Sequence, residues 1–509
     1  MSSDPIPLSN RQIGEFIANG FVILKSSLPP EFHAKVREIL GADSDTPHNF
    51  DNNLVPRYPV FHELFEEPVV RGAVASVLGD DFVIQPHRHG HTSYRRTVGE
   101  LDGWHKDSYW GYHKIRRQRP WMAMLMYYPQ ETTLALGPTR VVAGSQRLLR
   151  NPLPGANEDN ADAPYVQVHQ TFPEGTLLLI DYHIWHAAST HDSDQPRYMV
   201  KVEFSRQTPP VAREAGPMPL PKSRPYHDQH LAWQQNWNWL HGQSHTLPSR
   251  PSGARQSVPA ALKSLAAEDA ETRLKAVHSL VTPEADTPEV AAALAQRLGD
   301  RREAVAQEAA QALAALPANG LARLAEVLGG EDEALAQLAA QALACAGPDA
   351  VPLLVQALAS PQAHSRAAAA YALGEYPDSV TDGVRRGLLR AAADPELSVR
   401  MHALESIGLL GDSHAHSVEA LCKAVREDAE QQARWAAAWS LLRLAPKLDA
   451  GAVQESLLIG MRDENRYVRY YCLDTMSQLP DAAAREVARR HLLYSRWCTT
   501  TDGGHPFYP

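Results

Sequence analysis

Hydrophobic positions in the first 40 residues recur at the intervals of amphipathic helices. The first predicted helix follows the start signal Leu8-Ser9-Asn10 and places Ile13, Phe16 and Ile17 on one face. The second predicted helix spaces its apolar side chains in the same way over residues 32–40. Between the two helices, residues 20–24 form a short apolar run that predicts a strand.

From about residue 82 to 206 the pattern changes to short apolar runs separated by Gly, Pro and polar turns. The runs predict strands at 121–128, 140–142, 165–168, 175–180 and 197–204. Many short strands with frequent turn residues indicate a sandwich or a jelly roll. We therefore expect residues 1–245 to form a double-stranded β-helix, a jelly-roll or cupin-like fold, with flanking helices.

After a polar segment at 246–258, which we predict to be a linker, the chain repeats itself every 30 to 35 residues. A small residue marks the same point of each unit: Ala276, Ala309, Ala339, Ala369, Ala403, Ala437 and Cys472. In most units an arginine stands three residues earlier: Arg273, Arg366, Arg400, Arg434 and Arg469. Periods of this length with paired helical patterns predict an α-solenoid, in which each helix pair buries its apolar face against its neighbours.

The repeating segment resembles HEAT-like repeats of the short bacterial type. The resemblance implies about seven helix pairs over residues 259–498, followed by a tail at 499–509. The concave face of such a solenoid is a candidate binding surface for a protein partner or a substrate. Bracing of the first domain or dimerisation would produce the same sequence pattern.

Composition separates the two parts of the 509-residue chain, which is too long for one ordinary core. Of the 23 histidines, 16 lie before residue 246, whereas Ala and Leu dominate beyond it. All the cysteines lie in the repeating part and lack the spacing of metal ligands: Cys345, Cys422, Cys472 and Cys498. We interpret them as small buried apolar residues.

Hydropathy and charge limit the cellular compartments and the binding partners that we expect. The chain has no run of about 18 apolar residues, and its start lacks the basic and then apolar pattern of a signal peptide. We therefore expect a cytoplasmic protein with no membrane partner. The net charge of -10 argues against nucleic acid as a partner.

Four residues in the first domain suggest a metal-dependent chemistry: His105, Asp107, His186 and Arg197. Two imidazoles and one carboxylate make the facial triad that holds non-haem iron(II) and leaves positions open for substrate and oxygen. His105 and Asp107 form an HxD pair just before a predicted strand, so alternate side chains can project together. Arg197 opens the strand after the turn that follows His186, and its planar fork fits a carboxylate bidentately.

With these residues assembled, the first 245 residues resemble the phytanoyl-CoA dioxygenase family of iron(II)- and 2-oxoglutarate-dependent oxygenases. The similarity includes Asn19-Gly-Phe-Val-Ile-Leu24 after the opening helix, the HxD pair and Gly137-Pro-Thr-Arg-Val-Val-Ala-Gly-Ser145. It also includes a distal histidine followed eleven residues later by arginine. The resemblance implies that iron is bound by His105, Asp107 and His186. It also implies that Arg197 binds the distal carboxylate of 2-oxoglutarate.

His183 competes with His186 as the distal ligand, but only His186 has the eleven-residue distance to Arg197. We interpret His183 as a packed or hydrogen-bonded strand residue. Gln146 stands where the family often has histidine, at a position that is not a ligand. Ala188 stands where the family often has a hydroxyl residue that helps to hold the cosubstrate. The candidates to replace that hydroxyl are Thr139, Ser189 and the residues of 85–94.

The resemblance implies a reaction that uses iron(II), O2 and 2-oxoglutarate and releases succinate and CO2. Halogenases of this superfamily replace the carboxylate ligand with a small residue, so Asp107 favours hydroxylation. We expect hydroxylation of an aliphatic C–H bond in a metabolite or in a carrier- or peptide-bound substrate, with the repeats aiding substrate or partner binding. The alternatives are a protein-modifying oxygenase that docks its partner on the solenoid, and a non-catalytic interaction scaffold.

Several further residues are candidates for contact with substrate. Lys201 and Glu203 share strand parity with Arg197 and either line the pocket or form an ion pair. Residues 87–119 contain eight basic residues against three acidic ones, which either steer an anionic substrate or form a solvated face. Candidates for an aromatic wall of the substrate site are Tyr94, Trp104, Tyr109, Trp110 and Tyr112. Arg88 is a candidate for a basic contact with the substrate.

Overall fold

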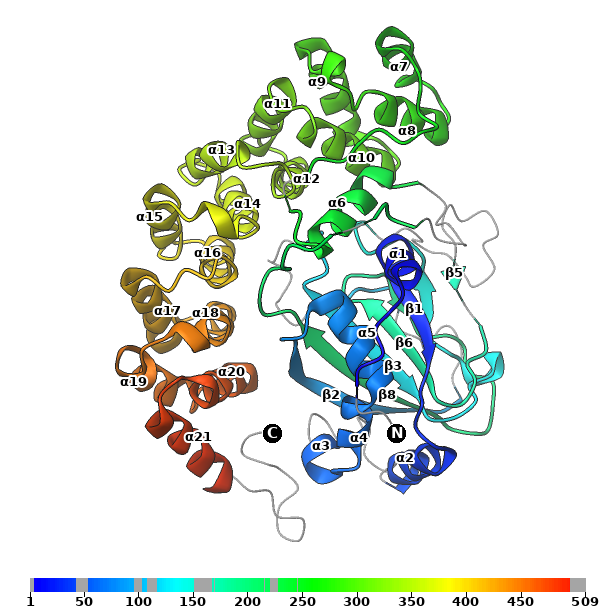
Figure 1. Cartoon of the computed structure of the whole chain (residues 1–509), viewed down its shortest axis with the longest axis vertical. Helices are drawn as coiled ribbons and strands as arrows, with labels where there is room; N and C mark the ends of the chain where they lie inside the picture. Colours follow the sequence, from blue (N-terminus) through cyan, green and yellow to red (C-terminus); the bar gives the residue numbers. More distant parts are fainter. Residues whose placement is uncertain are drawn as a thin grey trace.

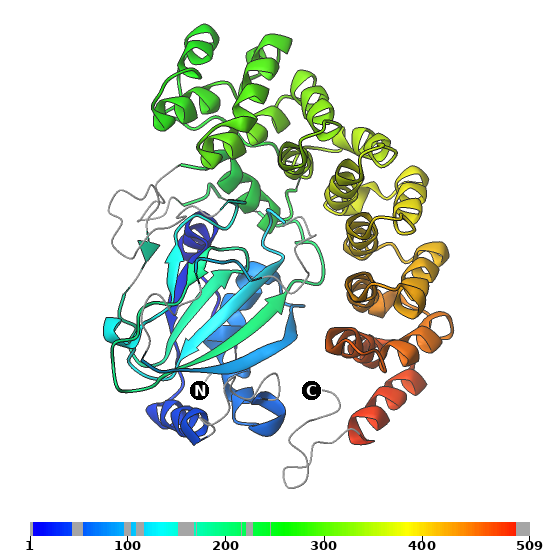
Figure 2. The ribbon, with the colours of Figure 1, turned by 180° about the vertical axis from the view of Figure 1, so that it is seen from behind.

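The computed structural model describes residues 4–42, 54–95, 103–107, 117–150, 167–168, 170–214, 216–219, 228–244 and 246–494. A sheet domain forms from the first part of the chain and an arc of helices from the second. The sheet domain lies in the hollow of the arc (Figure 1). Seen from behind, the arc follows one whole side of the sheet domain (Figure 2). The predicted combination of a cupin-like antiparallel sheet domain and an all-helical part is confirmed.

The opening of the chain matches the helix and strand predicted there. Helix α1 (Asn10–Asn19) begins after Ser9, whose side chain accepts from the backbone N–H of Gln12 in a capping box. Gly20 ends the helix at a φ of 82°, a left-handed conformation that glycine adopts without strain. The chain therefore turns directly into β1 (Phe21–Lys25).

The remaining elements of the sheet domain follow in chain order. The helices are α2 (Pro30–Ala42), α3 (Leu54–Arg57), α4 (Phe61–Glu66), α5 (Pro68–Leu78) and α6 (His230–Leu240), with the short 3-10 helix η3 (Leu134–Leu136). The strands are β2 (Val83–Ser93), β3 (Met122–Tyr128), β4 (Arg140–Val142), β5 (Gln167–Val168), β6 (Thr176–Asp181), β7 (His186–Ala187) and β8 (Arg197–Ser205).

The strands form a five-stranded antiparallel sheet in the order β1-β6-β3-β8-β2 and a three-stranded sheet in the order β5-β4-β7. Alternate side chains of the large sheet face opposite sides. One face packs on the helices, with Leu125, Leu179 and Val202 in a core shared with α1, α2, α4 and α5. The other face turns Met124 and Ile180 toward the small sheet. The inner face of the large sheet therefore lines the space in which a site can form.

Strand β2 is the one long strand that the sequence pattern did not predict. Its segment contains Pro86 and Gly90, which interrupt strands, and few β-branched residues. Pairing with β8 nevertheless holds it at the edge of the sheet, with an irregularity between Ile84 and Arg88. Tertiary pairing has overridden the local preference of the segment.

The helical part begins at α7, and its helices alternate between an inner row beside the sheet domain and an outer row (Figure 1). After α7 (Val258–Ser264) and α8 (Ala270–Ser279), the inner row is α10 (Glu303–Ala314), α12 (Glu333–Leu343), α14 (Ala363–Leu373), α16 (Leu397–Leu409), α18 (Gln431–Leu444) and α20 (Arg466–Gln478). The outer row is α9 (Pro288–Gln296), α11 (Asn319–Leu328), α13 (Ala350–Ala357), α15 (Asp382–Ala391), α17 (Ala415–Glu427) and α19 (Ala450–Gly460), and α21 (Ala482–Tyr494) follows.

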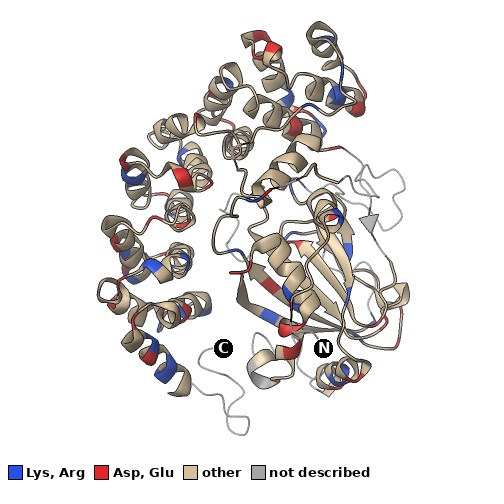
Figure 3. Cartoon of the chain, in the orientation of Figure 1, with Lys and Arg blue, Asp and Glu red and all other residues tan. Residues whose placement is uncertain are grey.

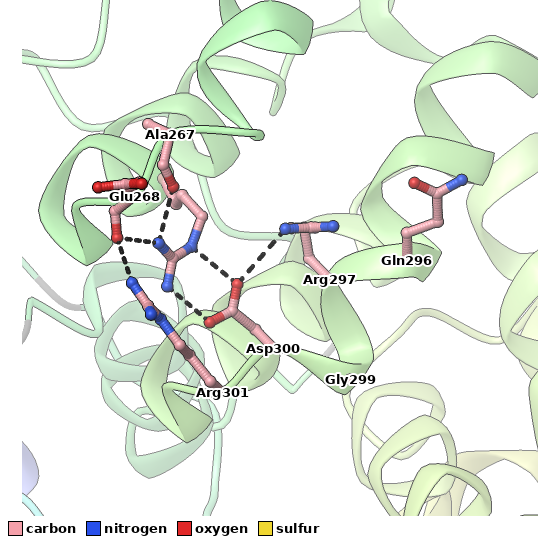
Figure 4. Close-up of a pocket in the computed structure, with 8 residues that line it drawn as sticks. Ala267, Glu268, Gln296, Arg297, Gly299, Asp300 and Arg301 are labelled. Atoms are coloured by element: carbon pink, nitrogen blue, oxygen red, sulfur yellow. Dashed lines mark hydrogen bonds and ion pairs between the residues drawn. The ribbon is translucent and has the colours of Figure 1, made fainter.

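In four units the recurring arginine of the repeats pairs with an aspartate of the next unit. Arg273 donates from Nε and Nη2 to Asp300, 27 residues later, at 2.8 Å each. Its Nη1 donates to the carbonyls of Ala267 and Glu268, in the loop between α7 and α8 (Figure 4). These contacts border a pocket of about 330 Å³. One guanidinium therefore satisfies two loop carbonyls and also bridges two units.

The same pairing recurs along the arc, which carries both basic and acidic residues over its length (Figure 3). The further pairs are Arg366 with Asp394, Arg400 with Asp428, and Arg434 with Asp463. Alanine replaces the arginine in two units, at Ala306 and Ala336. The small residue that marks each unit is fully buried at every position.

The inner row of the arc contacts the sheet domain through buried charges. Arg117 Nη1 lies 2.6 Å from Glu375 Oε1, and Arg119 Nη1 lies 3.0 Å from Glu375 Oε2. Glu405 of α16 lies 3.3 Å from Arg117. The indole of Trp121 donates to Glu375 at 3.0 Å. Arg117 and Arg119 were counted in a segment interpreted as steering or solvated, and that interpretation is wrong for both because they are buried between the domains.

Two further contacts attach the ends of the arc. Glu308 of α10 accepts the backbone N–H groups of Leu231 and Ala232, at 2.9 and 3.1 Å, at the start of α6. A carboxylate at a helix N-terminus satisfies unpaired N–H groups and favours the helix dipole. At the other end, the Tyr470 hydroxyl of α20 donates to the carbonyl of Ile84 in β2 at 2.8 Å. The inner face of the arc is therefore occupied by the chain's own sheet domain.

None of the helices in the described residues is long and apolar enough to cross a membrane.

Candidate metal centre

His105, Asp107 and His186 lie together, with one possible ligand atom from each within 4.8 Å of the others. The backbone brings the two histidines together, because His105 and His186 form an isolated antiparallel bridge with two N–H to carbonyl bonds of 3.0 Å. Asp107 follows two residues after His105, so its side chain reaches the same side. Three residues predicted from spacing therefore meet at the edge of β7.

Hydrogen bonds fix the orientation of both imidazoles. The Nδ1 of His105 lies 2.9 Å from the carbonyl of Gly103, and that of His186 lies 3.1 Å from the carbonyl of Ile184. A ring that donates from Nδ1 offers Nε2 as its acceptor. The two Nε2 atoms lie 3.9 and 3.7 Å from the oxygens of Asp107. Two nitrogens and a carboxylate thus face a common point, as a facial metal triad requires.

Lys201 is the charged partner of Asp107. Its Nζ lies 2.5 Å from Asp107 Oδ2 and 3.9 Å from Glu203 Oε1. Burial raises the pKa of Asp107, but the charges of Lys201 and His186 outweigh it, so the carboxyl titrates below its ordinary range. Burial lowers the pKa of His186 to about 4, so the ring is neutral near pH 7 and can bind a metal. Of the two interpretations given to Lys201 and Glu203, the ion pair is present, and it lies beside the metal ligands.

Arg197 lies on the same inner face of β8 as Lys201, four residues away or about 13 Å along the strand. It is 4% exposed. Its Nη2 donates to Ser93 Oγ at 2.9 Å, and its Nη1 donates to the carbonyl of Gly137. These contacts fix the guanidinium inside the domain, on the face of the sheet that also carries Lys201.

The two hydroxyls predicted to replace the one missing at Ala188 are both buried. Thr139 lies 2.8 Å from the Tyr128 hydroxyl, and the charge of Arg197 acts on that phenol. Ser189 instead donates to the carbonyl of Pro138, so its hydroxyl holds a loop. Thr139 and Tyr128 are therefore the hydroxyl pair on the Arg197 side of the site.

A row of histidines on β2 is the feature that sequence reasoning did not single out. His89 and His91 stand directly opposite Lys201 and Met199 of β8, so their side chains share the inner face with Lys201. Ring centroids are 4.4 Å apart between His87 and His89 and 4.2 Å apart between His89 and His91. Burial, with the charges of His89 and Lys201, lowers the pKa of His87 to about 2, so this ring is neutral.

The other predicted substrate residues are not brought to the metal ligands. Arg88 alternates to the opposite face of β2, where its charge acts on Asp474 of α20. Tyr94 is 50% exposed at the end of β2. The guanidinium of Arg140 lies over the indole of Trp104, 4.9 Å from the centroid of the indole ring. Tyr109, Trp110 and Tyr112 lie outside the described residues, as do Cys498 and the predicted tail.

His183 lies outside the cluster of possible ligands. Its backbone N–H donates to Asp181 Oδ1 at 2.9 Å, and its ring lies edge-on to Tyr182. The structure therefore assembles the ligand set around His186.

The donor set fits iron(II) by its chemistry. Two neutral imidazoles and one carboxylate on one side of a common point leave the remaining coordination positions open. Asp107 is 12% exposed and His105 is 43% exposed at the side chain. The site is therefore reached from the His105 side and closed on the side of the sheet.

Comparison with known proteins concerns the sheet domain. Residues 18–199 match the family model described as phytanoyl-CoA dioxygenase. No curated protein matches the chain. The solved structures that are similar to it at low identity include the following three. The apo form of EctD from S. alaskensis is 19% identical over 41% of this chain and 80% of its own, with a TM-score of 0.33. Iron-bound HygX from Streptomyces hygroscopicus is 16% identical over 40% and 88%, with a TM-score of 0.33. The nickel complex of the non-heme monooxygenase ThoJ is 19% identical over 46% and 96%, with a TM-score of 0.30.

Proposed function

Because residues 18–199 are a phytanoyl-CoA dioxygenase domain, we propose that this chain is an iron(II)- and 2-oxoglutarate-dependent dioxygenase that hydroxylates an aliphatic C–H bond of a small substrate. The observation that supports the proposal is the cluster of His105, Asp107 and His186, with both Nε2 atoms facing the carboxylate. The neighbouring arginine gives the cosubstrate a second anchor. An interaction scaffold that had lost catalysis would have no need of all four residues.

Each residue has a distinct task in this proposal. Iron(II), when bound, would activate O2, so that one oxygen atom enters the substrate as its hydroxyl and the other enters succinate as 2-oxoglutarate loses CO2. His105, Asp107 and His186 hold the metal on one side, and their backbone bonds keep the imidazoles from turning. Arg197 pairs with the distal carboxylate of 2-oxoglutarate. The hydroxyls of Thr139 and Tyr128 contact the same carboxylate in place of the hydroxyl missing at Ala188.

The contacts of the helical part with the sheet domain favour a small substrate. Its inner face holds Glu375, Glu308 and Tyr470, each bonded to the sheet domain. A protein partner therefore cannot use that face without displacing the sheet domain. This favours a small substrate that reaches the iron from the His105 side over a protein docked in the hollow of the arc.

Ligand binding without oxygen tests the proposal before any substrate is known. The full chain, loaded with iron(II) and titrated with 2-oxoglutarate, is expected to bind one iron and develop the visible charge-transfer band of a chelated 2-oxo acid. His105→Ala should lose both. Arg197→Ala should keep the iron and need roughly 100-fold more 2-oxoglutarate, because a charge-assisted bidentate pair is lost.

Arg37→Ala is the matched control, because Arg37 pairs with Glu174 outside the site. It should bind iron and 2-oxoglutarate as the native chain does. Iron binding with no response to 2-oxoglutarate at any concentration, and no succinate in air, would contradict the proposal.

A further inference from the structure

Helix α20 brings a second set of polar side chains to the inner face of β2. The Tyr470 hydroxyl bonds to the Ile84 carbonyl, and Tyr471 contacts the side chain of Gln85. One turn earlier, the Tyr467 hydroxyl lies 3.3 Å from His87 Nδ1. The first turn of α20 therefore meets the end of the histidine row that leads toward the metal ligands.

Close contacts connect this point to the metal ligands. His87 Nε2 lies 3.9 Å from Glu203 Oε1, which lies 3.9 Å from Lys201 Nζ. Lys201 in turn lies 2.5 Å from Asp107. The phenol of Tyr467 is thus three side chains away from a metal ligand, although 360 residues separate Asp107 and Tyr467 in the sequence.

Arg466 is held on this phenol. Its Nη2 donates to the Tyr467 hydroxyl at 3.3 Å, and its guanidinium lies 5.1 Å from the centre of the Tyr467 ring. The repeat arginines Arg273 and Arg400 are each paired with an aspartate. Among the described residues, no carboxylate pairs with Arg466. A half-buried guanidinium without an acidic partner offers two N–H donors to an anion.

The charges around the site leave Arg466 unbalanced. Asp107 gives its charge to the metal in the proposed function, and Glu203 then balances Lys201. His87 is neutral. The named carboxylates, Asp107 and Glu203, therefore do not neutralise the guanidinium of Arg466.

We propose that Arg466 binds an anionic group of the substrate, a carboxylate or a phosphate, and that Tyr467 positions its guanidinium. The helical part then contributes a residue that decides which substrates the site accepts. This inference rests on the proposed function, because it places the anion beside the iron site that binds 2-oxoglutarate.

Paramagnetic broadening tests the proposal with simple probes. The full chain is loaded with Mn(II) and saturated with 2-oxoglutarate, so that Arg197 is already engaged. Acetate and inorganic phosphate are then added separately, and the broadening of the acetate methyl protons and of the phosphate 31P signal is measured. Broadening of acetate identifies a carboxylate as the recognised group, and broadening of phosphate identifies a phosphate. Arg466→Ala should reduce the broadening at least fivefold, whereas Arg466→Lys should retain most of it.

Arg462→Ala is the matched control, because Arg462 is an exposed arginine four residues earlier, and it should behave as the native chain. Equal broadening in the native chain and in Arg466→Ala, or none of either probe in the native chain, would overturn the inference. The signals of 2-oxoglutarate report separately on the proposed function. If they are not broadened in the native chain, the proposed function and this inference both fail.

Discussion

At the scale of single residues, Lys201 places a positive charge beside the metal ligands. Lys201 lies 2.5 Å from Asp107, on the oxygen that also faces His186. Its ammonium therefore places a positive charge close to the point at which a divalent cation would bind. A metal ion has to overcome the repulsion of this fixed positive charge.

Removing that charge should strengthen metal binding and weaken the fold. We expect Lys201→Met to bind Co(II) about tenfold more tightly, because two positive charges a few ångströms apart repel each other by several kcal/mol at most. The metal-free variant should unfold more readily, because Asp107 and Glu203 lose a buried cation. Calorimetric titration with Co(II) and thermal melting of the metal-free protein measure the two effects.

Lys35→Met serves as the control, because Lys35 is half exposed and pairs with Glu38 on α2, away from the metal ligands. It should change neither quantity. Weaker metal binding by Lys201→Met would show instead that the lysine orients Asp107 for the metal.

The residue types of the site were predictable from the sequence, whereas the contacts around them were not. His105 and Asp107 are two residues apart, and the distance from His186 to Arg197 is short, so both patterns are local. Lys201 meets Asp107 across 94 residues, in a register that the sequence does not specify. The alternation of His87, His89 and His91 is a two-residue period that would have placed them on one face of a strand.

At the scale of elements, the two domains are joined by charges that neither could leave unpaired. Arg117 and Arg119 lie on the sheet domain, and Glu375 lies between two helices of the arc. All are almost fully buried. The repeat pattern predicted the helices, but the sequence gives no sign that these particular charges meet, because partners 258 residues apart share no periodicity.

Removing the central carboxylate should destabilise the whole chain. We expect Glu375→Ala to lower the free energy of unfolding by about 3 kcal/mol, because Arg117, Arg119 and the indole of Trp121 lose a buried acceptor. Urea denaturation followed by circular dichroism measures the loss.

Asp382→Ala is the comparison, because Asp382 also pairs with an arginine but is 78% exposed. Its removal should cost no more than about 0.5 kcal/mol. Equal costs for the two variants would mean that the interdomain charges contribute no more than a surface pair.

At the scale of the whole molecule, the sheet domain and the arc depend on each other. Glu308 caps α6, Glu375 pairs with two arginines, and α20 holds the edge strand β2. Without the arc, these groups would be left exposed or unpaired. The sequence predicted two domains, but it left open whether the concave face binds a partner or braces the first domain.

Cutting the chain between the domains should show this dependence. We expect residues 1–257 expressed alone to aggregate or to melt without a cooperative transition, because the cap of α6 and the partner of Arg117 are removed. Co-expression of residues 258–509 as a separate chain should restore a soluble complex, which size-exclusion chromatography detects. A monomeric 1–257 fragment that melts at the temperature of the full chain would contradict the interpretation.

Four repeat arginines pair with an aspartate 27 to 29 residues later, and this has a consequence for the length of the arc. An arc one helix pair shorter could still make every one of these internal contacts, so the repeats themselves do not fix their own number. The sheet domain fixes the number of repeats, since only an arc of this length brings Glu308 to α6 and Tyr470 to β2. The number of helix pairs thus matches the size of the sheet domain that they enclose. Loss of one pair would place a different helix beside the site.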